Sequence, residues 1–232
     1  MRYQDGDVEL IGELYGPASG DGRGVLVLHE ADGIGGNVRR RCAMLADLGY
    51  IALAADIHGG GRVLEGEDMR AAVEGARADP DRFRRRLRAG LDALATVADP
   101  QRLVAIGYCF GGLGVLELAR SGAPVRGVAS FHGLLTTRSP ARPGAIAAKI
   151  AAYTGAMDPL VPPEDIATFQ AEMAVANADW QLTVYGKAWH SFTNIGVKDS
   201  PDPRMDYDPD ADADSWASAL RFLDRALEGG SA

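Results

Sequence analysis

Hydrophobic residues occur along the chain in short unbroken runs that alternate with longer stretches of helical spacing. The unbroken runs are typical of buried strands, which we predict at 25–28, 50–57, 103–106, 125–131, 150–154 and 180–185. Helical spacing follows most of them, at 37–48, 83–97, 113–119, 164–176 and 215–227. Strands that alternate with helices predict an α/β fold, in which helices flank both faces of a mostly parallel central sheet.

Two stretches depart from this alternation. Residues 8–15 change roughly between apolar and polar at each position, which predicts an edge strand that ends at Gly16 and Pro17. Residues 62–83 are polar and weakly periodic, so we expect a loop or a short helix there, a candidate lid. No linker rich in proline, glycine or serine divides the chain, and we predict one domain over residues 1–232.

The strand at 103–106 leads into a motif that indicates catalysis. Cys109 stands between Gly107 and Gly111, directly before a helical stretch. This G-x-C-x-G pattern has the shape of a nucleophile elbow, with cysteine where serine usually stands. The glycines permit a turn so tight that a Cβ on them would clash with the adjoining strand and helix. At the amino end of a helix, the helix dipole would stabilise a thiolate on Cys109.

Asp158 and His190 follow two later predicted strands, so the chain order is nucleophile, acid, histidine, as in the α/β-hydrolase fold. Because parallel strands bring their carboxyl ends to one edge of a sheet, we expect these side chains to meet there. The Cys109 thiolate would attack a carbonyl carbon, His190 would move the proton, and Asp158 would orient the imidazole. The backbone N–H groups of Phe110 and Ala31 are the expected oxyanion donors.

Charge and cysteine content limit the classes of binding partner and the cellular location that we expect for this protein. The chain of 232 residues has 47% hydrophobic residues and a net charge of −8, with a pI near 5.0, which argues against nucleic acid or an anionic membrane as partner. No apolar run is long enough to span a membrane, and the N-terminus has no apolar signal core. The two cysteines, Cys42 and Cys109, form neither a disulfide framework nor a zinc pattern. We therefore expect a cytoplasmic location.

With these residues in place, the chain resembles the dienelactone hydrolase family of α/β hydrolases. The segments that carry the resemblance are 27–30, 54–56, 106–112, 130–133, 155–162 and 190–194. It implies a cysteine hydrolase for a small-molecule lactone or ester, without a metal or an organic cofactor. It also implies that Cys109 is the nucleophile, His190 the base and Asp158 the orienting acid, and that Glu30 contacts the nucleophile and helps to govern its charge. The oligomeric state stays open between monomer and homodimer.

The chain departs from this family where substrate carboxylates are bound. Asn194 stands in the region where the family has an arginine, a few residues after the catalytic histidine. The candidates for a second arginine are Arg62, Arg70, Arg77 and Arg85. Ser191 directly follows His190 and is a further candidate substrate contact. Since a buried carboxylate without a charged partner is unfavourable, the loss of an arginine would change substrate preference.

Several other signals have plainer explanations. His29, His58 and His132 lie near strand ends. His58 and His132 are candidates to line a pocket, but bonds to the backbone that brace loops are the plainer expectation. The acidic run at 206–214 lacks the glycine and glutamate of a calcium loop, so we predict a solvated loop and a helix cap at Asp214. The basic residues at 82–88 predict a solvated helix face. Two alternatives remain: a thiol acyltransferase or peptidase on the same fold, and a binding or redox-sensing member without turnover.

Overall fold

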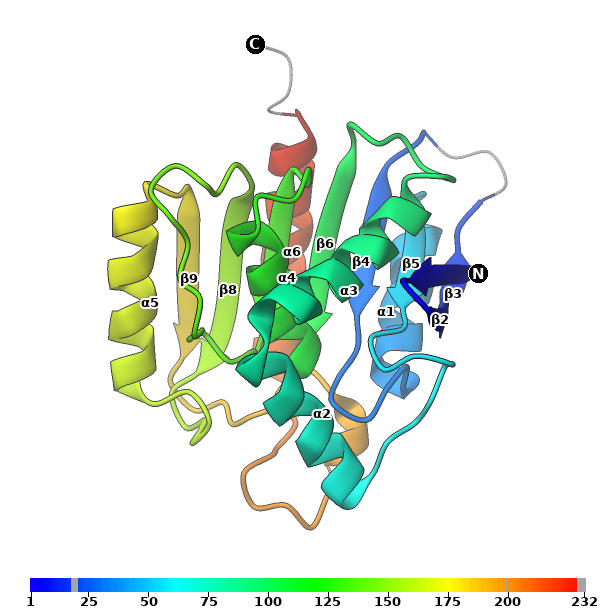
Figure 1. Cartoon of the computed structure of the whole chain (residues 1–232). Helices are drawn as coiled ribbons and strands as arrows, with labels where there is room; N and C mark the ends of the chain where they lie inside the picture. The colour runs from blue at the N-terminus through cyan, green and yellow to red at the C-terminus, as the bar shows by residue number, and fades with distance from the viewer. Residues whose placement is uncertain (18–20, 199, 229–232) are drawn as a thin grey trace.

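A computed structural model describes residues 1–17, 21–198 and 200–228 of the chain. One twisted sheet organises the molecule (Figure 1). In spatial order its strands are β3 (Glu13–Tyr15), β5 (Ile51–Ala55), β4 (Gly24–Leu28), β6 (Leu103–Tyr108), β7 (Gly127–Phe131), β8 (Lys149–Gly155) and β9 (Trp180–Tyr185). β3 pairs antiparallel with β5, and each of the other neighbouring pairs is parallel. The predicted α/β fold with a mostly parallel sheet is confirmed.

The helices cover both faces of this sheet. They are α1 (Gly36–Asp47), α2 (Gly66–Ala78), α3 (Pro80–Leu94), α4 (Phe110–Arg120), α5 (Pro163–Ala176) and α6 (Pro209–Glu228), with a short 3₁₀ helix η1 (Ile195–Val197). In Figure 1, α3 and α4 lie in front of the sheet, whereas α1 and α6 lie behind it.

Alternation along the central strands explains why both faces need a cover. On β4, Leu26 and Leu28 pack with the core under α3 and α4, whereas Val25 and Val27 pack with the core under α1 and α6. All four side chains are fully buried. An unbroken apolar run is therefore the sequence pattern of a strand with a hydrophobic layer on each side.

The amino-terminal prediction needs correction. Residues 8–15 do not form one edge strand: β2 (Val8–Ile11) pairs with β1 (Arg2–Asp5) in a separate two-stranded sheet, and only β3 joins the main sheet. Gly12 separates the two strands, and a Cβ there would overlap the carbonyl oxygen of Ala54. The close approach of the backbones at this point turns the chain from one sheet to the other.

Three helix boundaries also differ from the predictions. The polar stretch 62–83 contains α2 and the first turn of α3, and Asp79 caps α3 by accepting from the Arg82 N–H. The last helix begins at Pro209 rather than at residue 215, because Asp208, not Asp214, accepts the first N–H groups of the helix. α1 begins at Gly36 with Gly35 as its cap.

No helix in the described part of the chain is long and apolar enough to cross a membrane. Both cysteines are free thiols, and Cys42 is fully buried on α1, as its position in the helical pattern predicts.

Candidate active site

A strained turn between β6 and α4 presents Cys109 at the carboxyl edge of the sheet. Cys109 has φ +52°, a region that non-glycine residues seldom adopt. A Cβ on Gly107 would overlap the carbonyl oxygen of Gly111, and a Cβ on Gly111 would overlap the carbonyl oxygen of Leu28. The glycines therefore allow strand and helix to approach each other closely enough to hold the cysteine at the apex.

The three side chains expected from strand order lie in contact. The Nε2 atom of His190 is 3.1 Å from the Sγ atom of Cys109, and its Nδ1 atom is 2.8 Å from the Oδ2 atom of Asp158. Asp158 and His190 are almost completely buried, whereas Cys109 is half-buried and remains accessible to a ligand. The other carboxylate oxygen of Asp158 accepts from the backbone N–H of Leu160, which orients the carboxylate toward the imidazole.

The charges around His190 favour its protonated form. Burial alone would lower the pKa of the imidazole, but the thiolate of Cys109 and the carboxylate of Asp158 outweigh burial and raise that pKa to about 10. At neutral pH His190 is therefore an imidazolium, with the Cys109 sulfur on one side of the ring and Asp158 on the other. The contact places a proton donor beside the sulfur atom.

Glu30 lies close to this site but is bound elsewhere. Its Oε1 atom accepts hydrogen bonds from the side-chain amides of Asn37, at 2.9 Å, and Asn194, at 3.1 Å. No hydrogen bond within the described residues joins it to Cys109. Burial raises the pKa of Glu30 to about 7, despite the bond from Asn37. Asn194 thus contacts Glu30 as a neutral donor.

The two expected oxyanion donors flank the elbow. The N–H groups of Phe110 and Ala31 have no acceptor among the described residues. Two histidines brace the loop that carries Ala31: His29 contacts the Glu30 carbonyl at 2.6 Å through Nδ1, and His58 contacts the Ala31 carbonyl at 2.9 Å through Nε2. The predicted bracing role of these two histidines is therefore seen in the structure.

A pocket of about 270 Å³ opens beside Phe110, between the turn after β5 and the helices α2 and α3. Its residues are Ile57, His58, Arg62, Ala71, Ala72, Gly75, Ala76, Asp79, Arg82, Phe83, Arg86 and Phe110. We call it the α2 pocket. Small side chains from α2 leave the space open. Arg62, Arg82 and Asp79 also line it, together with Arg86, which is paired with Asp5. Of the arginines named from the sequence, Arg62 lines the α2 pocket, whereas Arg85 is exposed on α3 and does not.

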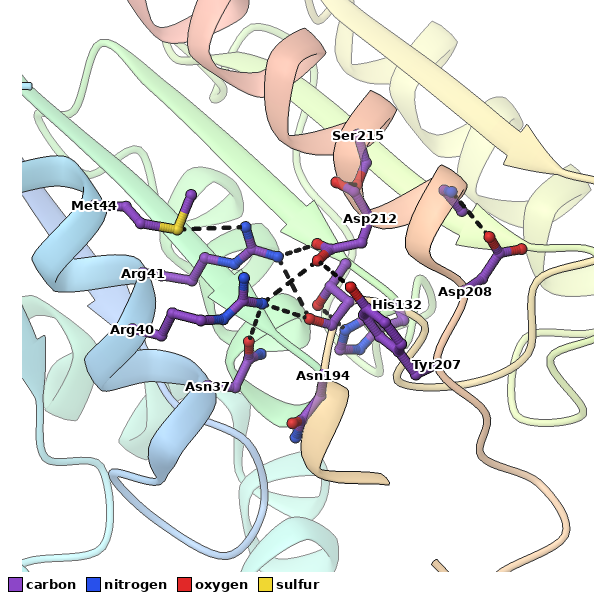
Figure 2. Close-up of polar contacts among 12 residues, drawn as sticks. Asn37, Arg40, Arg41, Met44, His132, Asn194, Tyr207, Asp208, Asp212 and Ser215 are labelled. Atoms are coloured by element: carbon purple, nitrogen blue, oxygen red, sulfur yellow. Dashed lines mark hydrogen bonds and ion pairs between the residues drawn. The ribbon is translucent and has the colours of Figure 1, made fainter. Parts of the chain in front are cut away.

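Between α1 and α6 lies a polar network that the sequence did not predict (Figure 2). Arg41 of α1 forms a buried ion pair with Asp212 of α6, and Arg40 donates to the carbonyl of Thr193 at 2.9 Å. Asp212 belongs to the acidic run expected to be solvated; instead its side chain is only 8% exposed, because α6 begins early enough to turn it toward α1. We call these residues, with Asn37 and His132, the α1–α6 network.

One signal for this network existed in the sequence. Asn37, Arg40 and Arg41 have the i, i+3, i+4 spacing that places them on one side of a helix. Thr193 and the burial of Asp212 had no such signal. The basic stretch at 82–88 is also only partly solvated, since Arg86 pairs with Asp5 and Arg84 with Glu117 at partly buried positions. Ser191 is buried with φ +60° beside His190.

No cluster of three or more histidine, cysteine or acidic side chains with metal-binding geometry occurs among residues 1–17, 21–198 and 200–228.

Comparison with known proteins accords with this geometry. A family model described as the dienelactone hydrolase family matches residues 10–227. The chain belongs to this family. The dienelactone hydrolase resemblance seen in its motifs is thereby confirmed, and the chain is a dienelactone hydrolase-like hydrolase.

Solved structures of related proteins superpose on nearly all of the chain. A structure named m3DLH is 39% identical with a TM-score of 0.92, covering 98% of this chain and 97% of its own. A dienelactone hydrolase-like promiscuous phosphotriesterase, P91, from metagenomic libraries is 36% identical with a TM-score of 0.91, covering 97% and 96%. A relative from Escherichia coli (strain K12), named "Putative carboxymethylenebutenolidase", is 28% identical over 86% of this chain and 75% of its own length.

Proposed function

We propose that this dienelactone hydrolase-like chain cleaves ester and lactone bonds with Cys109 as nucleophile, through a thioester. The observation that carries the proposal is the continuous contact from the Cys109 sulfur through His190 to Asp158, at 3.1 Å and 2.8 Å. Each of these residues also fits a structural role when taken alone. Their meeting at a strained elbow is what a covalent mechanism requires.

In the first step the thiolate sulfur attacks the carbonyl carbon, so that a C–S bond forms and the carbonyl electrons move to oxygen. The N–H groups of Phe110 and Ala31 would stabilise that oxyanion, since neither is engaged by another described residue. When the C–O bond breaks, the leaving oxygen takes the proton from the imidazolium of His190. A thioester on Cys109 and a neutral imidazole result.

In the second step water releases the acyl group. His190 accepts a proton from water as the water oxygen attacks the thioester carbon. Breakage of the C–S bond returns the thiolate, and the product leaves as a carboxylic acid that ionises in solvent. The imidazolium–thiolate pair is thereby restored, with Asp158 stabilising its positive member through Oδ2.

The α2 pocket is the proposed site for the part of the substrate that does not react. Phe110, which follows the nucleophile, forms one wall, and Phe83 stacks against it with ring centroids 5.1 Å apart. Alanines of α2 suit a hydrocarbon group, whereas Arg62 and Arg82 suit an anionic or strongly polar substituent. Ser191 stays a candidate contact because it adjoins His190, whereas Arg85 does not line this pocket.

A phosphotriester is a second candidate substrate. P91, which is 36% identical over nearly the whole chain, is described as a promiscuous phosphotriesterase. A thiolate beside two free N–H donors suits attack at phosphorus as well as at carbon, since both reactions place negative charge on an oxygen.

Steady-state hydrolysis of a neutral aryl ester, a dienelactone and an aryl phosphotriester tests both candidates. The variant Cys109→Ala is compared with Cys42→Ala, which removes the other thiol from a buried site on the opposite face of the sheet. We expect Cys109→Ala to lower kcat/KM about a thousandfold or more, because the covalent step is lost. Cys42→Ala is expected to keep its activity per folded molecule.

Full activity in folded Cys109→Ala would contradict the proposed mechanism. Mass spectrometry would detect an acyl group held on Cys109 as a thioester. Transfer of that group to an added amine or alcohol faster than to water would indicate an acyltransferase instead. If the native protein cleaves none of the three substrates, a binding or redox-sensing role becomes the better assignment.

A further inference from the structure

His132 occupies a position from which it contacts both proposed reacting residues. It directly follows β7, is fully buried and has φ +40°. Its ring lies 5.4 Å from the ring of His190 and 5.3 Å from that of Phe192, centroid to centroid. The steps proposed above do not use this imidazole, and a polar side chain at full burial requires partners.

The hydrogen bonds of His132 determine its tautomer. The backbone N–H of Cys109 donates to Nδ1 at 3.1 Å, and is shared with the Phe131 carbonyl at 3.0 Å. Nδ1 is therefore unprotonated, so the remaining proton is on Nε2 and donates to the Oγ1 atom of Thr193 at 2.9 Å. Burial lowers the pKa of His132 well below its usual value, and the charges of His190 and Arg41 lower it further. The imidazole consequently stays neutral and keeps this direction of donation.

Thr193 connects this bond to the loop that carries His190. Only two residues separate them, and Thr193 is fully buried. Its carbonyl accepts from Arg40 at 2.9 Å and from Arg41 at 3.4 Å, and Asp212 binds both guanidinium groups (Figure 2). The loop is thus anchored to α1 and α6 through its main chain and to the nucleophile elbow through its Thr193 hydroxyl.

We propose that His132 and Thr193 are positioning residues that join the backbone of Cys109 to the loop of His190 and so set the distance between sulfur and imidazole. The inference rests on the proposed function, because the two residues would position the imidazole of His190 for the proposed attack by the Cys109 sulfur. Cys109 and His190 come from segments 81 residues apart, and the 3.1 Å contact between them is held by no covalent link. A shift of about 1 Å between reacting groups can cost a hundredfold in rate.

Thr193→Val tests the bridge with little change of shape, because it replaces the hydroxyl by a methyl group. Thr193→Ser retains the acceptor. Thr154→Val is the matched control, since Thr154 is also fully buried and its hydroxyl has no hydrogen-bond partner among the described residues. We would measure kcat and KM for a neutral aryl ester, the pH dependence of Cys109 alkylation by iodoacetamide, and the urea midpoint of unfolding.

For Thr193→Val we expect kcat to fall about ten- to a hundredfold with little change in KM. The midpoint of alkylation should move about one pH unit upward, because a displaced imidazolium stabilises the thiolate less. Thr193→Ser should restore both quantities to within about threefold of the native values, and Thr154→Val should leave them unchanged.

His132→Asn cuts the same bridge at its other end, and asparagine tolerates the positive φ of this position. We expect the double variant His132→Asn, Thr193→Val to lose little more activity than either single variant, since each substitution removes the same hydrogen bond. Full additivity in kcat would contradict the proposal. So would a Thr193→Val protein that is less stable yet has native kcat and a native alkylation profile, because the bond would then serve folding alone.

Alkylation also separates this proposal from the proposed function. Should the native protein hydrolyse no ester, the proposed function fails, while the alkylation profiles still decide whether the bridge holds Cys109 against His190.

Discussion

The two sides of Cys109 differ in how their charges are held. In the α1–α6 network, Arg41 and Asp212 are buried and paired, and the Thr193 carbonyl accepts two further bonds. In the α2 pocket, Arg82 is exposed and its side chain has no ion-pair partner among the described residues. One side is therefore fixed before a ligand arrives, and the other is open to one.

The helices α6 and α2 show the same contrast. α6, which belongs to the network, buries a full apolar side against the sheet. α2 has no buried residue and borders its pocket with alanine and glycine. The difference teaches that rigid support and ligand space are separated in this fold: packed elements hold the reacting groups, and a lightly packed helix leaves room for the variable part of a substrate.

The largest effect is expected when the buried ion pair between Arg41 and Asp212 is broken. Asp212→Asn leaves the Arg41 guanidinium buried without a counter-charge, so we expect the free energy of unfolding to fall by about 3–5 kcal/mol. The matched change Asp92→Asn removes a carboxylate from the surface pair with Arg88, where both side chains are about half exposed. A loss below about 0.5 kcal/mol is expected there. Urea unfolding at neutral pH measures both, and equal losses would remove the distinction between the two pairs.

A second test uses the pH dependence of stability. The folded pKa of Glu30 is about 7, above its ordinary value of 4.5, so folding favours the protonated carboxyl. The protonated carboxyl of Glu30 therefore makes its whole contribution to folding stability below the ordinary pKa of 4.5. This contribution is lost as the pH rises through the folded pKa of about 7. Glu30→Gln cannot ionise, and we expect it to be more stable than the native protein by about 1–3 kcal/mol at pH 8 but not at pH 4.

Glu13 offers a control of opposite sign. Its bond with Arg39 lowers the pKa of this partly exposed carboxylate, so its stabilisation is present at neutral pH and is lost as pH falls. Glu13→Gln should therefore destabilise slightly at pH 8, by about 0.2–1 kcal/mol after screening by solvent. Urea midpoints across this pH range measure both variants. A pH-independent effect of Glu30→Gln would contradict the raised pKa.

The smallest effect is expected in the α2 pocket. Arg82→Ala should raise KM for an ester that carries a carboxylate about two- to fivefold, and should not change KM for a neutral ester of similar size. Arg85→Ala removes an equal charge from the same helix at a position outside the pocket. Steady-state kinetics with both esters then decide between the two arginines, and a larger effect at Arg85 would move the substrate to the outer side of α3.

Much of the fold was predictable because its signals are local. Unbroken apolar runs predicted the strands from β4 to β9, and the glycines around Cys109 predicted the elbow. The predictions were wrong where the sequence pattern was weak or fitted two structures equally well. The alternating residues 8–15 suited an edge strand, but the backbone turns at Gly12 into a second sheet. Several aspartates at 206–214 could each cap a helix, and only packing selected Asp208.

The sequence by itself determined the order in which Cys109, Asp158 and His190 follow their strands, and with it their meeting at one edge of the sheet. Parallel strands leave little freedom in where their carboxyl ends lie, so chain order is sufficient. Only the tertiary structure decided which polar residues support that group. The burial of Asp212 and the bond from His132 to Thr193 depend on how α1, α6 and the loop after β9 pack together. Such contacts join residues far apart in the chain, and a polar side chain has the same local pattern whether water or a buried partner binds it.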